Sequence, residues 1–400
     1  MTGLGMVTAA GAGVNATWRR VCEGSSTAAD ADPALAGMPV DFCASVPGPD
    51  LGVVGRRTVY RLDRFVQLVL VAAHEALADA ALVAADWDGT RVGVVIGCGM
   101  GGVATWEKQH ARLLGRGSEA VSPLLVPMMT PNMAAGEVAL ACGAQGPSFV
   151  VSTACASGAT AIASARGLLA SGECDIVIAG GTEAANTALT VAGFANLGAL
   201  SRRCADPRAA SRPFDTDRDG FVMAEAAAVL VLERAEHALA RGRRPRALLA
   251  GCGAATDAYH PTAPHPQGRG AREAMRAALR DAGLAPGDVD HVNAHGTSTV
   301  LNDAVEARVI SGVLTHGPLV TSTKGVLGHS LGATGAVEAA LTVLAIEQST
   351  VAPTANCENP DPVLDLNLVT KIPTRQRVRA ALSNSFGFGG HNVVLAFRTP

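Results

Sequence analysis

Lysine is scarce in this sequence, and charge of either sign is low. Lys108, Lys324 and Lys371 are the only lysines among 32 basic residues, and charged residues make up 17% of the 400. The 32 basic residues against 35 acidic ones give a net charge of −3. Nucleic-acid-binding proteins usually carry a strongly basic face. We therefore expect no nucleic-acid partner, and a lysine inside a motif becomes informative.

Paired cysteines and long apolar runs are missing as well. The nine cysteines lie between Cys22 and Cys357 without a C-x-x-C pair, which argues against a disulfide framework or zinc site and favours a reducing compartment. The N-terminus lacks the basic start and apolar stretch of a signal peptide. The longest uncharged run, 138–165, is broken by Gln145 and Pro147 and is no membrane helix. We expect a cytoplasmic protein without a metal or a membrane contact.

The apolar residues, 48% of the chain, are sufficient for a sizeable core in two domains or one two-lobed unit. Apolar runs alternate with segments of helical spacing, which favours a layered α/β fold with mostly parallel sheets. The predicted strands include Val92–Gly97, Ser148–Val151 and Asp175–Gly180, and the predicted helices include Phe65–Ala81, Ala156–Ala170 and Glu225–Ala240.

The chain contains a weak internal repeat. Met1–Thr8 (MTGLGMVT) resembles Leu249–Thr256 (LAGCGAAT), and each opens roughly half of the sequence. The arginine-rich stretch Arg241–Arg246 precedes the second copy and is typical of a surface connection. Chance similarity between two glycine-rich strands is the alternative explanation, but the motifs below favour a duplicated α/β unit in one compact body.

Cys155 lies in the segment Ser152–Gly158 (STACASG), between a predicted strand and a predicted helix. Free N–H groups and the helix dipole at a helix N-terminus favour a thiolate. Small neighbours leave room for a substrate carbonyl to approach the sulfur. Buried cysteine is also a common core residue, so these features by themselves leave a packing role open.

Three further motifs carry polar side chains. His295 in Val292–Thr299 (VNAHGTST) ends an apolar run before a glycine turn, which places an imidazole at the tip of a strand. Lys324 and His329 share the glycine-rich stretch 321–336, and a buried lysine needs an acidic partner such as Glu306. The turn 384–392 (NSFGFGGHN) offers backbone N–H groups that could hold an oxyanion.

Together these motifs resemble those of β-ketoacyl-acyl carrier protein synthases, the elongating ketosynthases of fatty acid and polyketide assembly in the thiolase superfamily. The resemblance runs from about Thr2 to Phe397 and rests on TGLGMVT, STACASG, NAHGTST, STKGVLGHSLGATG and NSFGFGGHN. It implies a five-layered αβαβα core built from two similar halves, normally a dimer. We expect an N-terminal half at 1–244 that carries the cysteine and a C-terminal half at 245–400 that carries the histidines and the lysine.

The resemblance also implies the catalytic roles. Cys155 would take the acyl chain from a carrier protein as a thioester. His295 and His329 would hold the malonyl carbonyl and stabilise the enolate that decarboxylation leaves. The N–H groups of Cys155 and Phe388 would form the oxyanion hole. Lys324 would orient His329, with Glu306 as its ion-pair partner.

Substrate contacts follow from the same resemblance. Thr297 and Thr299 match positions that contact the phosphopantetheine arm, which the carrier protein brings, so no cofactor of the chain's own is expected. Phe386 and Phe388 match a loop that gates the acyl pocket, and Asp257 matches the facing loop. Met100 matches a position on the pocket floor. The expected carrier-protein docking residues are Arg57, Arg61 and Arg203.

Some positions depart from the family pattern. The chain begins at the glycine-rich end of the first strand, so we expect a shorter sheet edge or a truncated start. Val300 replaces a common proline and Asn302 a common glycine, both beside the expected catalytic set. Glu119 lies where some relatives are basic, which leaves the extent of the docking surface open.

Alternative functions differ in their cysteines. A chain-length factor, the non-catalytic partner in ketosynthase heterodimers, usually lacks the nucleophile, so Cys155 argues against it. The catalytic half of such a heterodimer remains possible, as does a homodimer. A degradative thiolase would need a second cysteine near the C-terminal glycine motif, and 384–392 contains none. A cysteine hydrolase would need a histidine orienter that no motif supplies.

Overall fold

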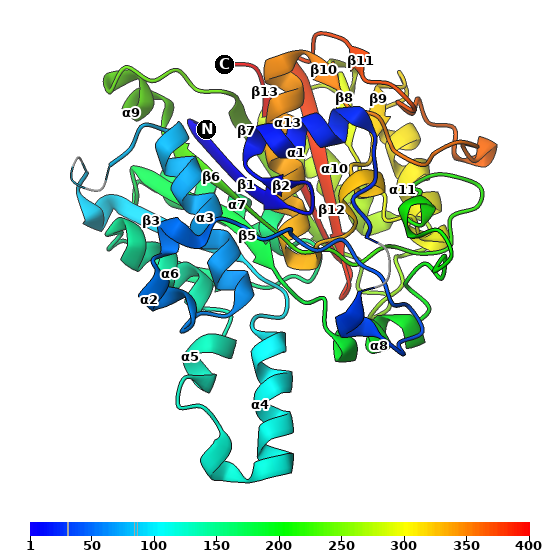
Figure 1. Ribbon diagram of the computed structural model, residues 1–400. Helices are drawn as coiled ribbons and strands as arrows, with labels where there is room; N and C mark the ends of the chain where they lie inside the picture. Colours follow the sequence, from blue (N-terminus) through cyan, green and yellow to red (C-terminus); the bar gives the residue numbers. More distant parts are fainter. Residues whose placement is uncertain (30–31, 84, 86) are drawn as a thin grey trace.

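A computed structural model describes residues 1–400 except 30–31, 84 and 86. Two mixed sheets and the helices that cover them form five layers (Figure 1). In spatial order the first sheet contains β2 (Gly11–Ala12), β1 (Gly3–Thr8), β6 (Ala226–Glu233), β5 (Ile176–Glu183), β3 (Val92–Gly97) and β4 (Ser148–Val151). The second contains β7 (Leu248–Thr256), β13 (His391–Arg398), β12 (Ala380–Gly387), β8 (His291–Asn293) and β9 (Leu319–Thr321).

The helices fall into a central pair and outer groups. The central helices, α7 (Ser157–Ala170) and α13 (Thr334–Gln348), contact each other and strands of both sheets. Helices α3 (Arg64–Asp79) and α6 (Met133–Cys142) cover the first sheet, and α10 (Arg269–Ala282) and α11 (Val300–Val313) lie beyond the second. The remaining α-helices are α1 (Val14–Glu23), α2 (Arg56–Val59), α4 (Val103–Arg116), α5 (Leu125–Met129), α8 (Ala188–Asn196), α9 (Ala235–Ala240) and α12 (Lys324–Leu327), and β10 (Thr350–Val351) pairs with β11 (Thr374–Arg375).

The two sheets share one topology. The order β1-β6-β5-β3-β4 corresponds strand by strand to β7-β13-β12-β8-β9, with the first two pairings antiparallel and the last two parallel in each. This confirms the five layers and the two similar halves. It also corrects the expectation of mostly parallel sheets, because two of the four matching pairings in each sheet are antiparallel.

Glycines explain why the repeat is visible in the sequence. A Cβ at Gly5 would lie 1.9 Å from the Ala72 carbonyl oxygen of α3, and a Cβ at Gly253 would lie 2.0 Å from the Ala274 carbonyl oxygen of α10. In each half, the matching strand (β1 or β7) therefore needs glycine where an outer helix crosses it. The similarity between Met1–Thr8 and Leu249–Thr256 reflects the same packing position twice.

One predicted helix is wrong. The segment Glu225–Ala240 forms β6, followed by the short helix α9. Strand β6 lies between β1 and β5, and nearly all of its residues are buried. A strand that is covered on both faces has a continuous apolar run without a period of two, so periodicity does not distinguish it from a helix. The alanines of this segment favoured a helix, but burial between two neighbouring strands makes it a strand.

None of the described helices combines the length and apolarity needed to cross a lipid bilayer.

The close contact at Gly253, where α10 crosses β7, leads to a prediction about stability. Gly253→Ala should lower the thermal unfolding midpoint, because overpacking a tight contact costs about 1–3 kcal/mol. Gly312→Ala in α11 is the matched control, since nothing lies within 4 Å of the added Cβ and alanine favours the helix. Equal midpoints for the two variants in differential scanning calorimetry would contradict the close crossing.

Candidate active site

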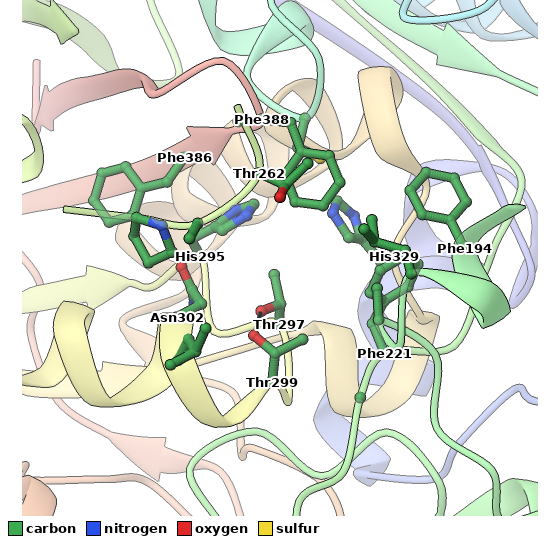
Figure 2. Close-up of a pocket in the computed structure, with 18 of the residues that line it drawn as sticks. Phe194, Phe221, Thr262, His295, Thr297, Thr299, Asn302, His329, Phe386 and Phe388 are labelled. Atoms are coloured by element: carbon green, nitrogen blue, oxygen red, sulfur yellow. Dashed lines mark hydrogen bonds between the residues drawn. The ribbon is translucent and has the colours of Figure 1, made fainter. Parts of the chain in front are cut away.

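A cavity of about 310 Å³ lies where the two halves meet and is lined by residues of both. Figure 2 shows the imidazoles of His295, on the left, and His329, on the right, at this cavity, with Phe388 above them and Thr297 and Thr299 below. Cys155 also lines it. The structure therefore brings together the residues of all four sequence motifs.

The backbone turns sharply at the cysteine. Strand β4 ends at Val151 and α7 begins at Ser157, and Ala154 between them has a left-handed backbone with φ of 51°. The Ser157 hydroxyl donates to the Ala154 carbonyl at 2.6 Å and accepts from the Thr153 N–H at 2.9 Å. These bonds hold a conformation that L-residues seldom adopt. The turn directs Cys155 into the cavity.

Burial dominates the electrostatics of the thiol. It raises the pKa of Cys155 to about 11, although Lys324 and the N–H groups of Phe388 and Cys155 itself lower it. The resting group is therefore a thiol, and the thiolate expected at the helix N-terminus is not favoured because burial outweighs it. The two N–H groups nevertheless approach the sulfur, where they favour negative charge.

Glu306 organises the His295 turn. Its carboxylate accepts from the N–H groups of His295 and Gly296 at 2.8 and 2.7 Å, and the Asn384 amide donates to it at 3.0 Å. The carboxylate is fully buried, and burial raises its pKa. Glu306 therefore fixes the backbone that carries the histidine.

The partner of Lys324 is Glu338, not Glu306. The Lys324 ammonium lies 2.5 Å from Glu338 Oε1 and 3.4 Å from Nδ1 of His295, and it also donates to the His295 carbonyl. The expected orientation of His329 by Lys324 is also corrected, because the contact falls on His295. Burial raises the pKa of Glu338 to about 7, while the ammonium lowers it.

His329 has a different environment. Its Nδ1 lies 3.0 Å from the Thr334 hydroxyl, and its ring packs edge-on against Phe221 with centroids 5.0 Å apart. The rings of His295 and His329 are 5.5 Å apart and nearly perpendicular. Burial and the neighbouring Lys324 lower the pKa of both well below its usual value. Both imidazoles are therefore neutral at pH 7, and each can donate from one ring nitrogen.

The other predicted cavity residues lie where expected. Thr297, Thr299, Phe386, Phe388 and Asp257 all line the cavity. The Thr297 and Thr299 hydroxyls are 2.9 Å apart. The Asp257 carboxylate accepts from the N–H groups of His265 and Gly270 and from the Asn392 amide, so it braces the loop facing Phe388.

Met100 does not line this cavity. Its side chain is 39% exposed, and its N–H donates to Glu183 at 3.1 Å. Since that bond anchors the backbone while the side chain faces outward, this chain by itself does not support Met100 as the pocket floor.

The expected docking residues lie in different settings. Arg203 pairs with Asp219 at 3.7 Å, and Asp219 lines the cavity, so Arg203 lies beside its opening. Arg61 is exposed and lies over the Tyr60 ring. The Arg57 side chain lies outside the described part of the structure.

Sequence reasoning missed Glu338, Thr334 and Phe221. Glu338 had a signal: it is an acid among the apolar residues of 336–346, and a charge in such a segment needs a buried partner. Thr334 and Phe221 had none, because hydroxyl and aromatic residues are frequent in cores without a catalytic partner.

A cysteine on a strained turn, two neutral imidazoles and inward N–H groups define a cysteine-dependent acyl-transferring enzyme on a duplicated α/β fold. The family model of the β-ketoacyl synthase N-terminal domain matches residues 1–238, and that of the C-terminal domain matches residues 246–358. The chain belongs to the β-ketoacyl synthase family, whose members are condensing enzymes.

Sequence relatives and solved structures resemble this chain over its full length. The chain is 44% identical to 3-oxoacyl-acyl-carrier-protein synthase 2 of Synechocystis sp. and 42% identical to that of Staphylococcus aureus, covering 100% of this chain and 97% of each relative. A type II polyketide ketosynthase solved with its acyl carrier protein superposes with a TM-score of 0.92 at 32% identity, covering 100% of this chain and 98% of that one. The ishigamide ketosynthase/chain length factor gives the same values.

The raised pKa of Cys155 predicts how it reacts. Because the thiolate is the reactive form and the pKa is about 11, alkylation by iodoacetamide should accelerate roughly tenfold per pH unit between about pH 7 and 9. Mass spectrometry of the peptide containing Cys155 would give the rate, with Cys155→Ala as the background for the other cysteines. A rate that is already constant in this range would contradict a protonated resting thiol.

Proposed function

We propose that this chain catalyses decarboxylative condensation of an acyl group on Cys155 with malonyl-acyl carrier protein, giving a β-ketoacyl-acyl carrier protein. The observation that carries the proposal is one cavity shared by the Cys155 sulfur and the two neutral imidazoles. The names and complexes of the relatives support the same substrates.

The first step is acyl transfer. Cys155 attacks the acyl thioester of the carrier protein, so that a C–S bond forms between Cys155 and the acyl carbon. The C–S bond to the phosphopantetheine breaks, and the phosphopantetheine sulfur leaves as a thiol with the proton of Cys155. The tetrahedral oxyanion lies at the N–H groups of Cys155 and Phe388, the two that approach the sulfur. These donors offset the burial that keeps the resting thiol protonated.

The second step uses the imidazoles. The bond to the malonyl carboxylate breaks, CO₂ leaves, and its electron pair becomes an enolate whose oxygen accepts from His295 and His329. The enolate carbon then attacks the Cys155 thioester, and collapse of the tetrahedral intermediate releases the sulfur, which takes a proton. Neutral imidazoles suit this role. A positively charged ring would already be paired with a negative group before the enolate forms, whereas a neutral ring is free to donate to the enolate oxygen.

Substrate delivery would use residues of the cavity wall and three arginines. Thr297 and Thr299 would contact the phosphopantetheine arm, and Phe386 and Phe388 would gate the acyl pocket opposite Asp257. Arg57, Arg61 and Arg203 would dock the acidic carrier protein, which steers association by charge. The arm belongs to the carrier protein, so we expect no cofactor of the enzyme's own.

The partner chain and setting are part of the proposal. We expect a dimer, either of this chain or with a chain-length factor, since related ketosynthases are solved with such partners. A division at 244/245 remains our prediction for the two halves. All nine cysteines are free, which supports a reducing, cytoplasmic setting.

The alternatives fit the cavity less well. A chain-length factor would not need the cysteine that lines the cavity. A degradative thiolase would need a second one, and Cys155 is the sole cysteine among the described residues of the cavity wall.

Cys155→Ala should abolish condensation while leaving the fold intact, because alanine fits where a small thiol was. We expect less than about a thousandth of the wild-type rate with malonyl- and acyl-carrier protein. Cys252→Ala, at a cysteine outside the cavity, is the matched control and should keep its activity. Condensation by the Cys155 variant above that level would contradict the nucleophile assignment, and circular dichroism would confirm folding.

A further inference from the structure

The side of His329 that faces away from the cavity is bounded by two hydroxyls. Thr334 Oγ1 lies 3.0 Å from His329 Nδ1 and 3.1 Å from Ser330 Oγ. Both hydroxyl residues are buried, at 3% and 6% exposed. In the part of the chain that the structure describes, neither hydroxyl has another hydrogen-bond partner within the protein. Ser330, Thr334 and the imidazole therefore form a short chain that ends at Nδ1.

The two histidines differ in what fixes their tautomer. His295 Nδ1 faces the Lys324 ammonium at 3.4 Å, and an ammonium only donates, so this ring keeps its proton on Nε2. His329 Nδ1 faces a hydroxyl, which can donate or accept. The direction of the hydroxyl chain therefore decides which nitrogen of His329 carries the proton.

One direction of the hydroxyl chain presents a donor to the ring. Ser330 and Thr334 line a second small cavity of about 10 Å³ together with Lys324, Glu338 and Glu225. Glu338 balances the charge of Lys324 there, so the hydroxyl contacts themselves set the direction. When Ser330 donates to Thr334 and Thr334 donates to Nδ1, the His329 proton stays on Nε2, toward the main cavity, as the proposed contact with the enolate requires.

We infer that Thr334, supported by Ser330, is a positioning residue that holds His329 as an Nε2 donor for the developing enolate. The inference rests on the proposed condensation and adds a residue outside the substrate cavity to it. Acyl transfer to Cys155 uses the backbone oxyanion hole instead, so Thr334 should matter for the decarboxylative step alone.

The test separates the two steps. Thr334→Val keeps the shape but removes the hydroxyl, and it should lower condensation about 10- to 100-fold. Removing a whole oxyanion donor lowers the rate about 10²- to 10³-fold. The loss expected here is smaller, because the correct tautomer of His329 stays partly populated. Acylation of Cys155 by acyl-carrier protein, followed by intact-protein mass spectrometry, should stay within about threefold. Thr334→Ser should restore condensation to within about threefold.

Thr342→Val is the matched control on α13. The Thr342 hydroxyl is buried and donates only to the Glu338 carbonyl. The control therefore loses a buried threonine hydroxyl, as Thr334→Val does, but the lost hydroxyl does not contact a histidine. Condensation by Thr334→Val equal to this control would overturn the inference. So would an equal loss of acylation and condensation, or a failure of Thr334→Ser to rescue.

Two further results keep the outcomes distinct. If Thr334→Val does not fold, Ser330→Ala should lower condensation about three- to tenfold, and unchanged condensation there would overturn the inference. Wild-type protein that does not condense would refute the proposed function, whereas wild-type condensation with an indifferent Thr334→Val would refute the positioning role alone.

Discussion

The active site depends on the close crossing of the two central helices. A Cβ at Gly158 would lie 2.6 Å from the Ala336 nitrogen, and one at Gly335 would lie 2.7 Å from the Ala159 nitrogen. The backbones of α7 and α13 thus meet without side chains between them. Cys155 precedes α7 and His329 precedes α13, so this contact brings residues from opposite halves of the chain to one cavity.

Burial then sets the chemistry of that cavity. The same exclusion of water keeps both histidines neutral and the cysteine protonated. It also demands that Lys324 have a counter-charge, which Glu338 supplies from within α13. One ion pair, two donor imidazoles and a thiol can share this buried site because Glu338 balances the charge of Lys324 and the imidazoles and the thiol are uncharged. The negative charge of the reaction develops where fixed donors are already in place.

Local sequence was most informative where backbone geometry demanded particular residues. Glycines in β1 and β7 revealed the duplication, because α3 and α10 approach them too closely for a Cβ. The motifs around Cys155, His295 and His329 located the cavity residues, since small and glycine-rich neighbours are required where chain segments converge. The helix predicted over Glu225–Ala240 failed because a strand buried on both faces lacks the periodicity that distinguishes it from a helix.

By itself, the sequence determined most of the elements, the repeat and the motif residues of the cavity, because these depend on spacing along the chain. Only the tertiary structure decided the pairings between those residues. Lys324 meets Glu338 and His295 rather than Glu306 and His329, and Met100 turns outward, since such contacts depend on how helices cross rather than on sequence separation. The protonation of Cys155 was decided the same way, because burial by distant segments outweighs the local pull of a helix N-terminus.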